Sequence, residues 1–280
     1  MERTIWAGVV VAVAALTGIA AWSLRPTAPL RHVERFPYLL PENQHFDSND
    51  AHNVAISPDG TKVAYVANQQ LYLRTQDQLE AQPIQGTDED PHQPVFSPDG
   101  QWIAYVVSVG GGAASAGVGG GLAALLKKVS TAGGVSNTLA RLDDNPLGVS
   151  WAKGSILFGE DVAGKGYGIR IVSDNGGEPR MLISVDGPSE RAAQPQLLDD
   201  GKHVVFTVGR AGSSEADSQI VVQSVEGGER RVLINGGADP HVLPMGQLVY
   251  IHNATVLVVP FDASKLSVNG DQAVPIANGV

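Results

Sequence analysis

The chain has 280 residues, a formal net charge of −10, 33 glycines, 17% charged residues and no cysteine. The lack of cysteine excludes disulfides, thiolate zinc sites and cysteine nucleophiles. The acidic balance, with basic residues only in isolated pairs, excludes a nucleic-acid-binding surface. A glycine-rich, charge-poor chain of this length is typical of a turn-rich β protein.

The first predicted element is an apolar segment from Thr4 to Leu24, which contains no charged residue and has Trp6 and Trp22 near its ends. At about 1.5 Å per helical residue it would span roughly 30 Å, the hydrocarbon thickness of a bilayer, with both indoles at the interfaces. The segment predicts one transmembrane helix, and a signal peptide cleaved near Ala20 is the alternative.

A short tail, residues 1–3, precedes this helix, and a linker, residues 25–35, follows it. Arg3 lies before the helix, whereas three arginines follow it within or at the end of the linker. By the positive-inside rule this distribution would place the C-terminal side in the cytoplasm. The rule therefore opposes the extracytoplasmic placement that we expect from the resemblance given below.

A repeat sets the architecture of the rest of the chain. Ser57-Pro58-Asp59-Gly60 returns as Ser97-Pro98-Asp99-Gly100, and a similar apolar run follows each copy. Proline presets φ in a tight turn, and glycine tolerates positive φ, so each copy predicts strand, turn, strand. Serine lies outside any Gly-x-Ser-x-Gly elbow here, so we interpret the serines and aspartates as structural turn markers and not as nucleophiles.

Three degenerate copies of this turn follow, which places marker glycines at 60, 100, 154, 201 and 246. Each marker precedes a β-rich run and a third strand, and turns such as Gly133-Gly134 lead to a fourth strand. Four strands at a period of 40 to 54 residues indicate the blades of an all-β propeller, with a β-sandwich of irregular hairpins as the alternative. The predicted propeller covers residues 36–280, with blades at about 53–87, 93–142, 147–186, 194–236 and 238–280.

A further strand is predicted at Arg31 to Tyr38, although the fifth blade has a fourth strand of its own at Ala273 to Ala277. The first interpretation is an incomplete ring in a chain that stops before its last blade or blades. The second is a closed ring of five blades with the extra strand at its edge. An incomplete ring would expose a sheet face and favour dimerisation or aggregation.

The candidate ligand-face residues are His52, Asp88, Asp90 and His92. His52 and His92 lie eight residues before their marker glycines, on connections that lead to one mouth of the central channel. Imidazole and carboxylate groups could hold a metal or a cationic ligand, but the other copies have no ligating residue in this register, so solvated loops are favoured. We therefore predict no catalytic, cofactor-binding or metal-ligating residue. A Gly/Ala/Ser-rich insertion, residues 110–124, lies on the same face and is interpreted as a flexible hairpin extension.

The chain from about Phe36 to Val280 resembles WD40-like, TolB-type propeller repeats. More narrowly, it resembles the extracytoplasmic propellers that follow a transmembrane helix in bacterial receptor serine/threonine kinases. The residues that carry the resemblance are Val54 to Gly60, Leu71 to Arg74, Gly86-Thr87, Pro94 to Ile103, Leu126 to Val129 with Gly133-Gly134, and Val259 to Asp262.

This resemblance implies a single-pass membrane protein whose periplasmic propeller senses or binds a protein, a peptide or a small ligand. The kinase itself is absent, because the chain has no Gly-rich nucleotide loop, His-Arg-Asp loop or Asp-Phe-Gly motif. We therefore expect no enzymatic activity. The alternatives are the propeller portion of a prolyl-oligopeptidase-type peptidase, whose hydrolase domain would follow downstream, and a TolB-like periplasmic scaffold.

Overall fold

The computed structural model describes residues 40–46, 52–109, 124–162, 166–186, 190–210, 212, 214–269 and 272–278. The predicted transmembrane helix at 4–24, the predicted strand at 31–38 and almost all of the insertion at 110–124 lie outside these residues. In the described ranges, no helix has both the length and the apolar character needed to cross a membrane.

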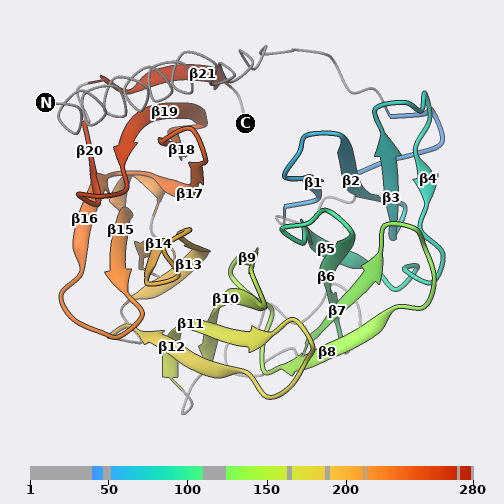
Figure 1. Cartoon of the computed structure of the whole chain (residues 1–280), viewed down its shortest axis with the longest axis horizontal. Coiled ribbons are helices and arrows are strands. Elements are labelled where there is room, and N and C mark those ends of the chain that lie inside the picture. The colour runs from blue at the N-terminus through green and yellow to red at the C-terminus, as the bar shows by residue number, and fades with distance from the viewer. Residues whose placement is uncertain are drawn as a thin grey trace, which may run out of the picture. The chain divides into compact units, whose positions relative to one another are not determined.

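The described residues from Glu42 onward form five antiparallel sheets, in chain order, which we call blades 1 to 5 (Figure 1). In each blade the first strand is innermost and later strands are added outward (Figure 1). Blade 1 consists of β1 (Val54–Ile56), β2 (Lys62–Ala67), β3 (Gln70–Thr75) and β4 (Gln82–Pro83). Blade 2 consists of β5 (Pro91–Phe96), β6 (Trp102–Ser108), β7 (Ala124–Ser130) and β8 (Asn137–Leu142).

The remaining strands repeat this plan. Blade 3 consists of β9 (Val149–Ala152), β10 (Ser155–Val162), β11 (Gly166–Ser173) and β12 (Arg180–Ser184). Blade 4 consists of β13 (Arg191–Leu197), β14 (His203–Gly209), β15 (Gln219–Ser224) and β16 (Arg231–Asn235), with the 3-10 helix η1 (Glu215–Asp217) between β14 and β15. Blade 5 consists of β17 (Ala238–Leu243), β18 (Gln247–His252), β19 (Thr255–Asp262), β20 (Ser267–Val268) and β21 (Val274–Asn278).

Blade 5 departs from the four-strand prediction because two short strands share the outer edge of one long strand. β19 has eight residues, and its first half pairs with β21 while its last two residues pair with β20. The short β20 falls in a stretch that the sequence analysis assigned to no strand. The predicted fourth strand, β21, is present beside it.

The five marker glycines all have positive φ, from 66° at Gly100 to 78° at Gly154. In the first copy, the Gly60 N–H donates to the Ser57 carbonyl at 2.8 Å, and Gly100 makes the same bond to Ser97. The turn geometry predicted for the repeat is therefore present in both full copies. It returns the chain from the innermost strand of each blade to the second.

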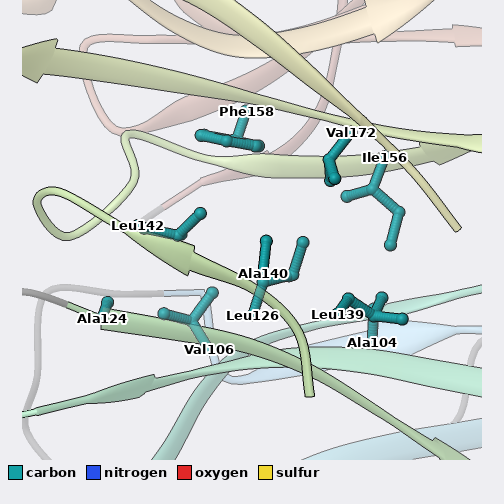
Figure 2. Close-up of a cluster of buried hydrophobic side chains, with 10 residues drawn as sticks. All are labelled: Ala104, Val106, Ala124, Leu126, Leu139, Ala140, Leu142, Ile156, Phe158 and Val172. Carbon is teal, nitrogen blue, oxygen red and sulfur yellow. The ribbon is translucent and has the colours of Figure 1, made fainter. Parts of the chain in front are cut away.

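Apolar side chains join each blade to the next. Four clusters of buried residues lie between blades 1 and 2, 2 and 3, 3 and 4, and 4 and 5. In the cluster between blades 2 and 3, Val106 and Leu126 from one sheet face Ile156 and Phe158 from the next (Figure 2). Among the described residues, no such cluster joins blade 5 to blade 1.

These features confirm the predicted fold class, an all-β, five-blade propeller built on four-stranded blades. The β-sandwich alternative is wrong, because each repeat forms its own sheet, and the described strands of each sheet contact strands of the neighbouring repeats. The sheets bring the starts of their five innermost strands close together, and the candidate site lies there.

Candidate functional site

Three innermost strands begin with the same irregularity. Gln93, Gln194 and Asp239 each precede a proline and have φ between 46° and 56°, a left-handed conformation that is rare for residues other than glycine. Each lies where the pairing of the innermost strand with the second strand shifts register. Such strained positions cost about 1–3 kcal/mol and persist only where surrounding contacts impose them.

The contacts that impose this conformation are hydrogen bonds to the preceding blade. The Gln93 N–H donates to the His52 carbonyl at 3.0 Å, and the Gln194 N–H donates to the Leu147 carbonyl at 2.7 Å. The Asp239 N–H donates to Thr207 Oγ1 at 3.1 Å. The bulge therefore turns each backbone N–H out of its own sheet and toward a neighbouring sheet.

We call the region where the five innermost strands begin the mouth, residues 52–53, 90–93, 145–148, 190–196 and 237–242. Side chains add further links between blades there. Gln93 Nε2 donates to the Pro146 carbonyl at 2.8 Å, so Gln93 joins blade 2 to both neighbours. The side-chain oxygens Oε1 of Gln93 and Gln194 are buried and, within the described structure, accept no hydrogen bond.

A carboxylate between two imidazoles lies where blade 5 meets blade 1. Asp239 Oδ2 lies 3.1 Å from His52 Nε2, and Asp239 Oδ1 lies 3.2 Å from His241 Nε2. The carboxylate is mostly buried, whereas the imidazoles of His52 and His241 are 52% and 60% exposed. The cluster therefore joins blade 1 to blade 5 through two residues that lie 187 positions apart in the sequence. It also leaves the imidazoles of His52 and His241 partly exposed to solvent.

Both partners of the His52–Asp239 contact have shifted pKa values. The hydrogen bond to Asp239 raises the pKa of His52, and its effect exceeds the opposing effect of burial. Burial alone would raise the pKa of Asp239, but the hydrogen bonds from His241 and His52 hold it well below the ordinary range. The pair therefore favours a protonated imidazole beside an ionised carboxylate.

The other predicted ligand-face residues, Asp88, Asp90 and His92, have different contact partners from those of the His52–Asp239–His241 cluster. His92 is buried, and burial lowers its pKa against the opposing effects of the Asp90 carbonyl and Asn145. Asp88 and Asp90 are exposed, and Glu89 between them is paired with Lys127 at 2.7 Å. The structure therefore joins His52 to Asp239, and not to the acidic run near His92.

A second charged cluster lies beside the mouth in blade 3. Arg170 Nε lies 2.8 Å from Glu160 Oε2, and both side chains are almost completely buried. Glu160 Oε1 also accepts the backbone N–H groups of Asp143 and Asp144. Burial raises the pKa of Glu160 despite these partners. Glu160 thus links β10 both to β11, through Arg170, and to the connection that leads toward β9, so we interpret this cluster as structural.

The serine and aspartate of each full turn motif are engaged within the turn itself. Ser57 Oγ donates to Asp59 Oδ1 at 2.6 Å and accepts the Lys62 N–H at 2.9 Å. Ser97 and Asp99 repeat the first contact at 2.5 Å. These bonds lie at the end of the innermost strands opposite to the mouth, where the chain turns into β2 and β6.

The described part of the chain contains no group of three or more His, Cys, Asp or Glu side chains arranged to hold a metal ion. The mouth offers the exposed imidazoles of His52 and His241, the ionised carboxylate of Asp239 between them and the amide groups of Gln93 and Gln194. Such groups can accept hydrogen bonds from a ligand and donate to it.

The sequence analysis missed Asp239, Gln93 and Gln194, although a signal for them exists. They lie seven residues before marker glycines 246, 100 and 201. The prediction of His52 and His92 used the position eight residues before each marker glycine, which is one residue earlier. Asn53 lies at the same position before Gly60, so four of the five repeats carry a polar residue there. Proline follows in three of the five, and that pair marks the bulge.

Comparison with solved structures supports a TolB-type propeller fold. TolB from Acinetobacter baumannii matches with a TM-score of 0.57 and 17% identity over 81% of this chain and 54% of that chain. A putative TolB from Agrobacterium tumefaciens matches with a TM-score of 0.57 and 19% identity over 81% of this chain and 82% of that chain. An acylaminoacyl peptidase matches with a TM-score of 0.50 and 15% identity over 82% of this chain and 39% of that chain.

This chain therefore corresponds to about half of the Acinetobacter TolB chain and to less of the peptidase. No protein-family model matches the sequence. No curated protein matches it either.

Proposed function

We propose that this protein is a non-catalytic binding module, anchored to the membrane by residues 4–24, which captures a protein, a peptide or a small ligand at the mouth of an extracytoplasmic propeller. The observation that carries the proposal is that the mouth contains both the unpaired amide oxygens of Gln93 and Gln194 and the exposed imidazoles of His52 and His241. A buried acceptor without a donor is unfavourable, and a ligand N–H group would satisfy it.

The mouth suits a ligand that donates hydrogen bonds, such as a peptide backbone or an amine. Asp239 supplies an ionised carboxylate between the imidazoles, and Asp88 and Asp90 add exposed negative charge on the connection that leads to β5. These charges favour cationic groups on the ligand. A sensory or scaffolding role follows if capture of that ligand is passed to partners across or along the membrane.

The non-catalytic part of the proposal is supported by how the reactive side chains are used. Ser57 and Ser97 bond the aspartates of their own turns, and the Glu160 carboxylate is buried against Arg170. The lowered pKa values of Asp59 and Asp99 make these carboxylates weak bases, poorly suited to activate the serines as nucleophiles. The membrane anchor and the relation to receptor kinases are supported by the sequence features alone.

Panning of a peptide phage library on the full chain tests the binding role. We expect recovered peptides to lose at least about tenfold in affinity when Gln93 and Gln194 are both replaced by leucine, because their side-chain acceptors are removed. His203→Gln serves as the matched control, since His203 bonds Asp200 within a turn far from the mouth. Peptides that bind all variants equally would contradict the assignment of the mouth.

Topology is tested with alkaline phosphatase and β-galactosidase fused in turn to the C-terminus. We expect phosphatase activity, because that enzyme matures only outside the cytoplasm. An active β-galactosidase fusion with an inactive phosphatase fusion would overturn the extracytoplasmic placement, and it would agree with the arginine distribution around the predicted helix.

The likeness to the propeller of an acylaminoacyl peptidase favours one alternative, a propeller that gates access to a hydrolase domain. Extending the reading frame beyond Val280 distinguishes the two functions. A Gly-x-Ser-x-Gly elbow with downstream Asp and His would favour the peptidase. Further propeller repeats would favour the binding module.

A further inference from the structure

We propose that the His52–Asp239 contact is a proton-operated latch that closes the propeller between its first and fifth blades, and that deprotonation of His52 releases blade 1 from blade 5. The latch would operate without any ligand at the mouth. Its contact differs in composition from the contacts at the four other interfaces between blades.

Those four interfaces combine an apolar cluster with hydrogen bonds near the axis. Between blades 4 and 5, for example, Leu198 and Val205 pack against Leu248 and Tyr250, and Gln196 pairs with the backbone of Val242. Burial of several large side chains at about 25 cal/mol per Å² makes such interfaces insensitive to pH.

The interface between blades 5 and 1 is different. Among the described residues no apolar cluster spans it, and blades 1 and 5 are joined there by the hydrogen bond between His52 Nε2 and Asp239 Oδ2 at 3.1 Å. Both blades carry exposed apolar residues, with Val54 at 49% and Ile56 at 65% on the innermost strand β1 and Val274 at 55% on the outer strand β21. The strength of this closure therefore depends on the charge state of two side chains.

Among the described residues, few charged or titratable groups lie on the elements around the latch. β17 contributes Asp239 and His241, and the neutral Thr207 on β14 accepts the Asp239 N–H. On β5 the nearest titratable residue along the chain is the buried His92, which bonds the Asp90 carbonyl. β13 begins at Arg191, which is paired with Asp161 at 2.9 Å. His52 is the cation that joins blade 1 to this carboxylate.

The direction of the pH effect follows from the two shifts. The contact with Asp239 raises the pKa of His52, so protonated His52 stabilises the closed form. This stabilisation is complete below the ordinary imidazole pKa of about 6.5. It is lost as the pH rises through the raised pKa of His52. Because contact lowers the pKa of Asp239, the advantage persists down to pH values below about 4. The latch is therefore strongest in weakly acidic solution and weakest above neutrality.

The absence of cysteine from the chain allows a direct test. Leu79→Cys in blade 1 and Met245→Cys in blade 5 lie on exposed turns and would each carry a spin label. Double electron–electron resonance on the full chain then gives the distribution of distances between blades 1 and 5 at pH 5.5 and pH 8.5. We expect a narrow distribution at pH 5.5 and an added population at longer distance at pH 8.5. Between pH 5.5 and pH 8.5 the ratio of closed to open molecules should fall, by up to about tenfold for each pH unit between the ordinary and the raised pKa of His52.

Two variants identify the group responsible. His52→Gln should give the pH 8.5 distribution at both pH values, because glutamine keeps a donor but carries no proton that titrates. His203→Gln should behave like the parent, since the His203–Asp200 pair at 2.6 Å lies within one turn of blade 4. An unchanged distribution between the two pH values in the parent would overturn the proposal even if His52→Gln did not fold. Persistence of the pH effect in His52→Gln would also overturn it.

Discussion

One side chain, Gln196 on β13, satisfies both backbone groups of Val242 on β17. Gln196 Oε1 accepts the Val242 N–H at 2.6 Å, and Gln196 Nε2 donates to the Val242 carbonyl at 3.0 Å. The amide thus takes the place of a paired strand across the interface between blades 4 and 5. This interface holds β17, which carries the latch carboxylate Asp239.

Gln196→Ala should therefore destabilise the protein well beyond an ordinary surface substitution. Loss of the amide leaves the Val242 N–H and carbonyl without partners, and we expect a decrease of about 2 kcal/mol in the free energy of unfolding. Urea denaturation followed by tryptophan fluorescence measures it. Gln76→Ala is the control, because the exposed Gln76 side chain donates one hydrogen bond, to the Gly60 carbonyl, so its effect should stay within about 0.5 kcal/mol.

Two glycines should respond very differently to alanine. Gly60 has φ of +75° and open space around it, so Gly60→Ala meets only the left-handed strain of about 1–2 kcal/mol. A Cβ at Gly159 would lie 2.3 Å from the Ala192 carbonyl oxygen of the next blade. We expect Gly159→Ala to lower the melting temperature far more than Gly60→Ala. Similar melting temperatures for the two variants would show that blades 3 and 4 do not approach this closely.

The buried pair of Glu160 and Arg170 should show strong coupling in a double-mutant cycle. Removal of one partner, as in Glu160→Leu or Arg170→Leu, leaves an uncompensated buried charge and should cost about 3–5 kcal/mol. Replacement of both residues by leucine should recover most of that loss, because no charge is left buried. Additive losses in the cycle would contradict the direct contact.

Acid should weaken the first turn only at very low pH. The hydrogen bond from Ser57, together with those from Thr61, lowers the pKa of Asp59 to about 2. The stabilising effect of a depressed carboxyl is present above its ordinary value of about 4 and is lost as the pH falls through the lowered value. Titration of the Asp59 carboxyl carbon by NMR should give a midpoint near 2. A midpoint near 4 would show that the turn bonds do not form in solution.

The turns and strands of the fold could be predicted from the sequence because the repeat signals them locally. The marker glycines have the positive φ that the Ser-Pro-Asp-Gly motif requires, and runs such as 220–223 and 256–259 lie within strands β15 and β19. β20 could not be predicted in this way, because two residues carry no period. It forms only because the long β19 leaves an edge free.

The contact between His52 and Asp239 could not be inferred from repeat register. Register pairs His52 with His92, since both lie eight residues before a marker glycine. In the structure His52 instead contacts Asp239, which lies seven residues before its marker glycine in the fifth repeat. The bulge before Pro240 changes the direction of the chain at Asp239. Contacts between the first and last blades depend on the angles between all successive blades. A local sequence pattern does not determine those angles.

Hydrogen bonds from bulged residues to neighbouring blades organise the mouth. Hydrogen exchange of backbone amides, resolved by NMR at pH 5.5, tests it most directly at Gln93 and Gln194. We predict that both amides exchange as slowly as those within β6 and β14, because they donate to carbonyls of His52 and Leu147. Exchange as fast as that of the exposed turn amides would contradict the claim, since it would leave these bulges without partners in neighbouring blades.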